Sequence, residues 1–229
     1  MKFPILEINK HFASINTIQG IFSVFGDFGV GKTTFALQIA TESAKIGKNV
    51  IYIYTKHNFP AEKILLHNYN SKEILNNIIF IQTTHFDELN KIIFNLEFLI
   101  LNHINKRKIN YNLIVVDSIT NLYQLELNKT NKQKNYESNY KLNQMLANLT
   151  YLNEAYDIEI LIINEISRKN INNEIIELQT GGKVMEYWVN YQLKIARTKK
   201  LNERKLILTA YPEQNTTNFL SIIRKKGFE

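Results

Sequence analysis

A glycine-rich stretch near the N-terminus has the residue types and spacing of a phosphate-binding loop. It comprises Gly26, Asp27, Phe28, Gly29, Val30, Gly31, Lys32, Thr33 and Thr34. Glycines allow the backbone to wrap around phosphates with its amides pointing inward. Lys32 would then meet the outer phosphates, the hydroxyl of Thr33 would bind magnesium, and Thr34 would donate to the innermost phosphate. A glycine-rich turn that binds nothing is the alternative, which the apolar strand before the loop and the helix after it disfavour. The sequence therefore predicts a site for a nucleoside triphosphate, ATP with Mg²⁺.

Asp117 is the second candidate magnesium ligand. It follows the apolar run 113–116. Ligands gather at the carboxyl ends of parallel strands, and a carboxylate placed there would hold the metal directly or through a water. The alternative role is that of a helix N-cap, which the neighbouring Ser118 makes plausible.

Short apolar runs alternate with amphipathic stretches, which predicts an α/β fold with a mostly parallel central sheet flanked by helices. The expected parallel strands are residues 21–25, 50–54, 78–81, 113–116 and 158–163. Helical spacing of apolar residues covers 31–46, 86–103 and 142–152. Residues 191–196, 206–209 and 219–223 predict antiparallel strands at the C-terminal end. Two polar segments, 128–140 and 167–180, are expected to be loops.

The composition restricts the class of protein. At 229 residues, 45% hydrophobic and 21% charged, the chain is expected to form a single globular domain. It contains no cysteine, which excludes disulfides and thiolate metal sites. Neither a signal peptide nor a run that could span a bilayer is recognisable, so a cytoplasmic location is expected. The net charge of +7 would attract polyanions such as nucleic acid, although a lysine- and asparagine-rich composition can also reflect an AT-biased coding sequence.

Three parts of the sequence together resemble the RecA-like recombinases, and within them the archaeal RadB family. They are the phosphate loop, the segment 112–123 with its Val-Asp-Ser core, and Gly181-Gly182 with Trp188. The resemblance covers nearly the whole chain. It implies a RecA-like core over residues 1–229, ATP binding, DNA binding, and a role in DNA repair and homologous recombination, with weak ATPase activity and no strand exchange. Because about twenty residues precede the first strand, the additional N-terminal helical domain of the archaeal recombinase RadA is expected to be missing.

The resemblance also places two DNA-facing loops, at residues 124–140 and 167–180. Their basic residues are Lys129, Lys132, Lys134, Arg168 and Lys169. Such charges would contact phosphates and make DNA binding sensitive to salt without reading the base sequence. A solvated polar loop explains the same residues equally well.

The chain departs from the active members of this superfamily at two positions that serve hydrolysis. A glutamate that activates the attacking water normally follows the second strand, and here the pair is Thr55-Lys56. A protonated lysine cannot accept that proton, and the loss of a general base costs about a hundred- to ten-thousand-fold in rate. Related proteins also carry a Lys-His-Arg segment near the position of 208–211, which reads Leu-Thr-Ala-Tyr here. Both departures predict very slow hydrolysis.

A third departure is Asn164-Glu165, where the family has an Asn-Gln pair that senses the terminal phosphate. The strands that lead to Lys56 and Glu165 should be neighbours in a RecA core. We therefore expect these two side chains within reach of a salt bridge. Two alternatives remain: Glu165 replaces the missing base as a catalytic residue, or it has drifted at a site no longer used for turnover.

These observations favour an ATP-binding protein that uses the bound nucleotide to control its affinity for DNA or for a recombinase of the RadA type. Two other functions remain open. One is an active DNA-stimulated ATPase of RecA type, and the other is a KaiC-like signalling ATPase without a nucleic-acid role.

Overall fold

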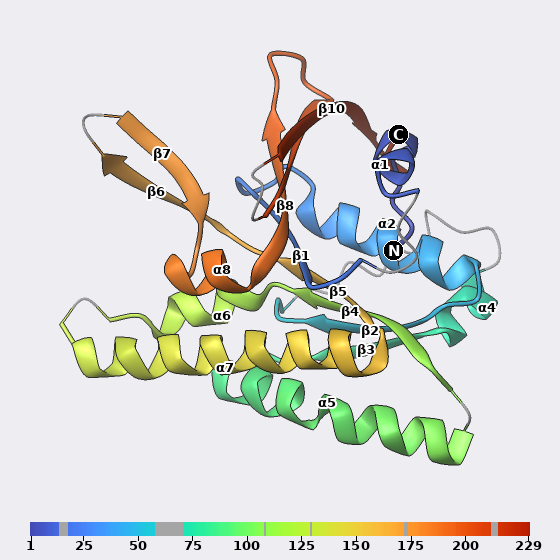
Figure 1. The fold of residues 1–229 in the computed structure, drawn as a ribbon. Helices are drawn as coiled ribbons and strands as arrows, with labels where there is room; N and C mark the ends of the chain where they lie inside the picture. The colour runs from blue at the N-terminus through green and yellow to red at the C-terminus, as the bar shows by residue number, and fades with distance from the viewer. Residues whose placement is uncertain (14–17, 58–70, 108, 129, 172–173, 212–214) are drawn as a thin grey trace.

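A computed structural model describes residues 1–13, 18–57, 71–107, 109–128, 130–171, 174–211 and 215–229 (Figure 1). Its central sheet contains the strands β1 (Ile21–Gly26), β2 (Asn49–Tyr54), β3 (Ile78–Gln82), β4 (Tyr111–Asp117), β5 (Glu159–Ile163), β8 (Val189–Arg197), β9 (Glu203–Ala210), β10 (Asn215–Arg224) and β11 (Gly227–Phe228). The strands lie in the order β11-β10-β9-β8-β1-β5-β4-β2-β3. From β8 to β3 all neighbours are parallel, whereas β8 to β11 are antiparallel. The predicted α/β class, with a mostly parallel sheet and antiparallel C-terminal strands, is confirmed.

Helices cover both faces of this sheet (Figure 1). One face is covered by α1 (Leu6–His11), α2 (Lys32–Lys45) and α4 (Ser71–Asn76), and the other by α5 (Phe86–Arg107), α6 (Ile119–Glu126), α7 (Lys132–Tyr156) and α8 (Lys183–Trp188). Alternate residues of a parallel strand therefore enter two different cores, as in β2. Val50 and Tyr52 belong to the core that includes α2, while Ile51 and Ile53 belong to the core that includes α5 and α7. This double burial explains why the strands read as continuous apolar runs in the sequence. None of the described helices combines the length and apolar content that a membrane span requires.

The order of the strands brings the candidate site together. The phosphate loop follows β1, Lys56 follows β2, Asp117 ends β4, and Glu165 follows β5. Because β1, β5, β4 and β2 are adjacent and parallel, their carboxyl ends meet at one edge of the sheet. Residues that are far apart in the sequence thus reach the same edge.

The polar segment 128–140 is not a loop over most of its length, contrary to the prediction. Helix α7 begins at Lys132, and the side chain of Asn131 caps it by accepting a 3.0 Å hydrogen bond from the amide of Lys134. Because the first turns of α7 are mostly exposed, they need no apolar stripe. An amphipathic pattern could therefore not reveal them.

The segment 167–180 was also expected to be a loop, and this expectation is wrong as well. It forms an antiparallel hairpin of β6 (Ile166–Ile171) and β7 (Glu174–Gln179), with Ser167 paired to Leu178. The hairpin projects from the body of the molecule (Figure 1). Backbone hydrogen bonds hold the two strands together, so their largely polar side chains do not show the alternation by which a half-buried strand is recognised.

Candidate nucleotide-binding site

The phosphate loop closes tightly between β1 and α2. Gly31 is the residue before the first turn of α2 and has φ of 110°, a conformation that side chains disfavour. A Cβ at Gly31 would lie 2.7 Å from Ile223 and 2.9 Å from Phe228, because the C-terminal strands pack closely against the loop. The amide end of α2 points into the loop, and the partial positive charge of a helix N-terminus favours a bound anion there.

Lys32 is almost completely buried and holds the start of the loop. Its Nζ donates to the carbonyl oxygen of Gly26 at 2.7 Å and to that of Asp27 at 3.0 Å. The ammonium therefore lies inside the curve of the loop, next to the place where phosphates would bind.

Two arginines from the C-terminal strands hold the rest of the loop, and no sequence pattern predicted them. Arg197 of β8 donates to the carbonyl of Phe28 at 2.8 Å, and Arg204 of β9 donates to the carbonyl of Val30 at 3.1 Å. Arg204 is only 7% exposed and has no ion pair with a carboxylate in the described part of the chain. Burial and the nearby charge of Arg197 lower the pKa of Arg204. Both cations therefore hold the loop through its carbonyl oxygens.

A cavity of about 280 Å³ opens beside the loop. Its lining residues are Phe28, Gly29, Gly31, Lys32, Thr33, Thr34, Lys56 and Ile223. Two of these residues are cations, and none of them is a carboxylate. The chemistry of this lining suits a polyphosphate.

Asp117 is completely buried at the end of β4. Its Oδ2 accepts a 2.9 Å hydrogen bond from the hydroxyl of Tyr52, whereas its Oδ1 has no hydrogen-bond partner among the described residues. Burial raises the pKa of the Asp117 carboxyl, while the charge of Lys56 and the hydroxyls of Thr33 and Tyr52 act in the opposite direction. A buried carboxylate oxygen without a partner, beside a threonine hydroxyl, is what a magnesium site offers before the metal arrives.

The alternative role of Asp117 as a helix cap is excluded by the structure. Ser118 is the N-cap of α6, and its hydroxyl accepts a 3.0 Å hydrogen bond from the amide of Asn121. No group of three or more His, Asp or Glu side chains suited to a metal occurs in the described residues. Magnesium that bridges a phosphate group needs only one or two protein oxygens and keeps its waters, so Thr33 and Asp117 would suffice.

Glu165 lies between the two lysines of the site. One carboxylate oxygen, Oε2, is 3.0 Å from Nζ of Lys32, and Oε1 is 4.0 Å from Nζ of Lys56. The expected proximity of Lys56 and Glu165 is confirmed. The shorter contact, with the lysine of the phosphate loop, was not foreseen.

Arg168 of the β6–β7 hairpin is half exposed but is engaged by two carboxylates. Its guanidinium forms an ion pair with Asp27 of the phosphate loop and a 3.0 Å ion pair with Glu177 of the same hairpin. These carboxylates raise the pKa of Arg168. The ion pair of Arg168 therefore connects the hairpin to the phosphate loop. It adds to the contact between Lys32 and Glu165, which lies three residues before Arg168.

The other predicted DNA contacts are spread over two elements. Lys132 and Lys134 belong to the first turn of α7, where Lys134 forms a 2.8 Å ion pair with Glu126. Lys169 is exposed on β6, and Lys129 lies outside the described residues. The structure thus places Lys132 and Lys169 at the surface and engages Lys134 with a carboxylate.

Most of the positive charge of the chain is located elsewhere. Residues 183–229 contain ten of the 28 lysines and arginines but only four of the 21 acidic residues. This part of the chain forms α8 and the strands β8 to β11. The excess charge therefore does not by itself identify the two predicted DNA-facing segments.

Tyr52 is a further site residue that the sequence reasoning missed. It is completely buried in β2, and a buried phenol usually has a hydrogen-bond partner. This rule could have pointed to a polar group near β2. It could not have identified Asp117, which is 65 residues away in the sequence.

Comparison with known proteins agrees with this architecture. The sequence profile of the Rad51 family matches residues 11–228. A DNA repair and recombination protein RadB of Methanococcus maripaludis strain C5 is 33% identical over 189 residues, which cover 82% of this chain and 80% of that protein. The protein of the same name from Methanocaldococcus jannaschii is 35% identical over 200 residues, 84% of each chain, and that of Methanobrevibacter smithii is 27% identical over 186 residues, 80% and 76%. The chain therefore belongs to the Rad51 family of RecA-like proteins and, within it, to the archaeal RadB proteins.

Proposed function

We propose that this protein binds ATP with Mg²⁺, hydrolyses it very slowly or not at all, and uses the bound nucleotide to control its association with DNA and with a recombinase of the RadA type in DNA repair and recombination. It catalyses no strand exchange of its own. Gly26 to Thr34 hold the phosphates, and Thr33 and Asp117 hold the metal. Oδ1 of Asp117, which has no hydrogen-bond partner among the described residues, supports the metal role, and the cavity lined by Lys32 and Lys56 supports the nucleotide role.

One observation supports slow hydrolysis above all. Lys56 follows β2 and lines the cavity at the place where an active relative would offer its glutamate. A protonated lysine cannot take a proton from the attacking water. Glu165 is the nearest substitute, yet both of its oxygens face lysines rather than the open cavity. We therefore assign Glu165 to the control of binding rather than to general-base catalysis.

DNA association is supported by membership of the RadB proteins and by Lys132 and Lys169, two exposed cations on the segments that resemble DNA-facing loops. A KaiC-like signalling ATPase without a nucleic-acid role would lack this binding. Affinity for single-stranded DNA measured over a range of salt concentrations separates the two, because contacts to phosphates give a steep salt dependence. Binding that is absent, or that is indifferent to salt, would contradict the proposal.

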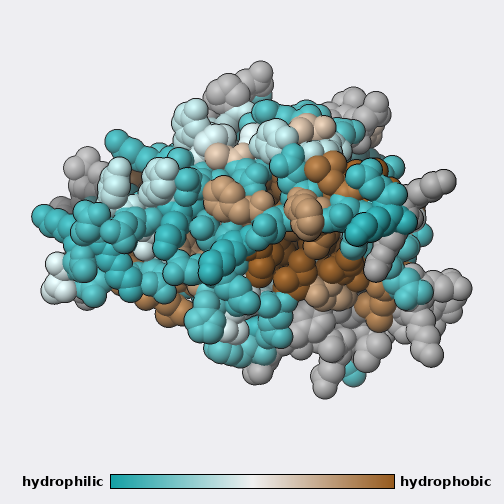
Figure 2. Space-filling view, turned by 90° about the horizontal axis from the view of Figure 1, so that it is seen from below, coloured by the Kyte–Doolittle hydropathy of each residue, from teal (hydrophilic) through white to brown (hydrophobic). Residues whose placement is uncertain are grey.

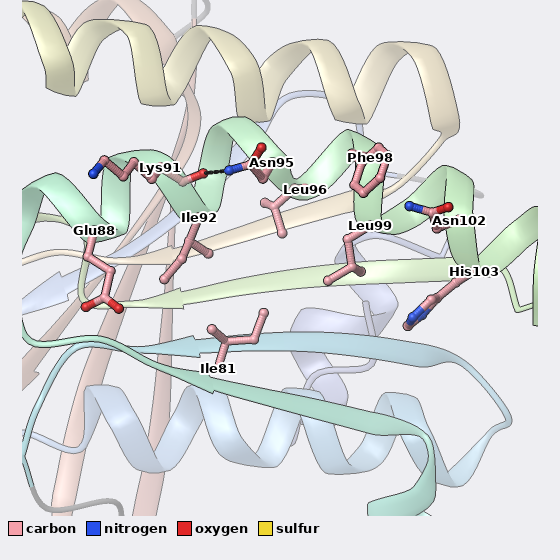
Figure 3. A pocket seen from close by; sticks show the side chains of 10 residues that line it. All are labelled: Ile81, Glu88, Lys91, Ile92, Asn95, Leu96, Phe98, Leu99, Asn102 and His103. Carbon is pink, nitrogen blue, oxygen red and sulfur yellow. Dashed lines mark hydrogen bonds between the residues drawn. The ribbon is translucent and has the colours of Figure 1, made fainter.

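An apolar groove supports a protein partner. Figure 2 shows apolar side chains gathered in a hollow on the face that carries α5, and Figure 3 shows its lining. The groove has a volume of about 440 Å³ and lies between β3, the edge strand of the sheet, and α5, with Ile81, Ile92, Leu96 and Leu99 among its lining residues. An edge strand offers unpaired backbone groups to an extended segment, and the groove beside it would receive an apolar side chain of that segment. We propose that an extended segment of the RadA-type recombinase binds there.

The groove is tested by Leu99→Glu, which places a charge against its apolar wall. Co-purification with a RadA-type recombinase should be lost, while ATP binding stays unchanged because α5 lies on the opposite face of the sheet from α2. Leu201→Glu, at an exposed leucine in the β8–β9 turn, is the matched control and should leave the association intact. Equal association of both variants and the unmodified protein would exclude this groove.

A further inference from the structure

Lys32, the first residue of α2, and Lys56, which follows β2, line the same cavity, and the carboxylate of Glu165 connects them. We propose that Lys56 is a ligand of the terminal phosphate of ATP, and that Glu165 is an internal competitor that occupies both lysines until the nucleotide replaces it. The inference rests on the proposed ATP site and adds how that site distinguishes a triphosphate from a diphosphate.

The positions of the charges support this assignment. Lys32 is fixed to the carbonyls of Gly26 and Asp27, so its ammonium cannot move far without breaking the loop. Lys56 is about one-third exposed and has only the 4.0 Å contact with Glu165 as an ion pair among the described residues. The positive charge of Lys56 also lowers the pKa of the Asp117 carboxyl, against the larger upward effect of burial. Lys56 is therefore near the proposed metal ligand as well.

A carboxylate between two ammonium groups resembles the oxygen of a bound phosphate in charge and in hydrogen-bonding capacity. A triphosphate carries more charge than the single carboxylate and brings a magnesium ion with it, so it should displace Glu165 from both lysines. ADP lacks the terminal phosphate and would leave Lys56 with Glu165. Lys56, which cannot serve as the base, would thus give the protein a preference for ATP.

The test compares equilibrium binding of ADP and of a non-hydrolysable ATP analogue, both with magnesium, to the full chain. Lys56→Met keeps the length of the side chain and removes its charge. It should weaken binding of the ATP analogue by about tenfold, as expected for one lost charged hydrogen bond, and leave ADP binding nearly unchanged. Glu165→Gln should strengthen binding of the analogue more than that of ADP, and this gain should shrink when Lys56→Met is also present.

Lys141 and Asp87 provide the matched control. They form a 2.7 Å lysine–carboxylate pair on α7 and α5, outside the cavity. Lys141→Met and Asp87→Asn should therefore change neither affinity. The melting temperature of each variant without nucleotide reports separately on any structural role of the charge pair.

Three outcomes are informative. If Lys56→Met reduces the affinities for ADP and the analogue equally, or only lowers the melting temperature, Lys56 is not a ligand of the terminal phosphate. If Glu165→Gln weakens binding of the analogue, Glu165 is no competitor. If the unmodified protein binds neither nucleotide, the proposed function itself fails, and that result is distinguishable from the other two.

Discussion

The hydroxyl of Tyr52 donates a 2.9 Å hydrogen bond to Oδ2 of Asp117, and both side chains are completely buried. This contact fixes one oxygen of the carboxylate and leaves Oδ1 available. The carboxylate, in turn, raises the pKa of the phenol further, after the larger effect of burial. Tyr52 therefore positions the side chain of Asp117, the proposed metal ligand.

Removing this hydroxyl should weaken magnesium binding. Tyr52→Phe leaves Asp117 without its fixed partner, and the loss of such an orienting contact typically costs about ten- to a hundredfold in metal affinity. The measurement is a magnesium titration of nucleotide binding. Tyr151→Phe removes an exposed phenol that donates to Glu97 at 2.8 Å and serves as the control, which should titrate like the unmodified protein. Equal magnesium affinity of both variants would remove the positioning role.

Asp117→Asn should increase the stability of the nucleotide-free protein at neutral pH and abolish its stabilisation by Mg²⁺ and ATP. The folded protein holds the pKa of Asp117 above its ordinary value, so the unfolded chain releases this proton at lower pH than the folded one. The free energy of unfolding therefore falls as pH rises from about 4 through the raised pKa, and it stays low above that value. The free energy of unfolding of Asp117→Asn should not show this decrease, because asparagine does not titrate.

Denaturant titrations at several pH values check this prediction. Without nucleotide, the stability of Asp117→Asn relative to the unmodified protein should increase with pH, while stabilisation by Mg²⁺ and ATP is lost. A variant that is less stable than the unmodified protein at neutral pH, or that keeps its magnesium-dependent stabilisation, would contradict the account of this residue.

Arg204 should matter for both stability and nucleotide binding. Arg204→Met keeps much of the packing but removes the donors to the carbonyls of Val30, Leu201 and Glu203. Loss of the buried charged hydrogen bond to Val30 should cost about 2 kcal/mol of the free energy of unfolding. It should also weaken ATP binding, because the loop is no longer held. Lys205→Met, at the exposed neighbouring position of β9, is the control. Normal ATP affinity in a destabilised Arg204→Met protein would limit Arg204 to a structural role.

The ion pair between Asp27 and Arg168 predicts an effect on DNA binding. While Arg168 is engaged by the phosphate loop, it cannot contact a phosphate of DNA. Asp27→Asn should free Arg168 from the phosphate loop and leave only its ion pair with Glu177 of the same hairpin. Affinity for single-stranded DNA without nucleotide should then rise, and the slope of log K against log salt should steepen by up to about 0.7. Arg168→Ala, alone or combined with Asp27→Asn, should abolish this gain. A gain that persists without Arg168 would show that the ion pair does not restrain DNA binding.

Much of the fold was predictable because its parallel strands are buried on both faces. Val50 to Tyr54 and Leu113 to Val116 are continuous apolar runs for that reason, and the glycine spacing of the phosphate loop is a local property of the chain. The β6–β7 hairpin and the first turns of α7 are different. Their exposed side chains carry no periodic pattern, so backbone hydrogen bonds and the cap at Asn131 decide their structure.

The site was predictable only in part, for a related reason. Its phosphate loop is contiguous, and Asp117 stands at the end of a recognisable strand. Arg204 reaches Val30 across 174 residues, and the ion pair of Arg168 with Asp27 spans 141. Such contacts arise from the order of the strands, which no local pattern reveals.

Hydrolysis of bound ATP tests the central claim most directly. Purified protein is mixed with ATP and Mg²⁺, with and without single-stranded DNA, and bound ATP and released ADP are followed together, with Lys32→Ala as the reference that should not bind. The account predicts stoichiometric binding of ATP that remains intact, and no substantial acceleration by DNA. Turnover that DNA raises to about 1 s⁻¹ or more, in the ordinary range of enzymes, would contradict it.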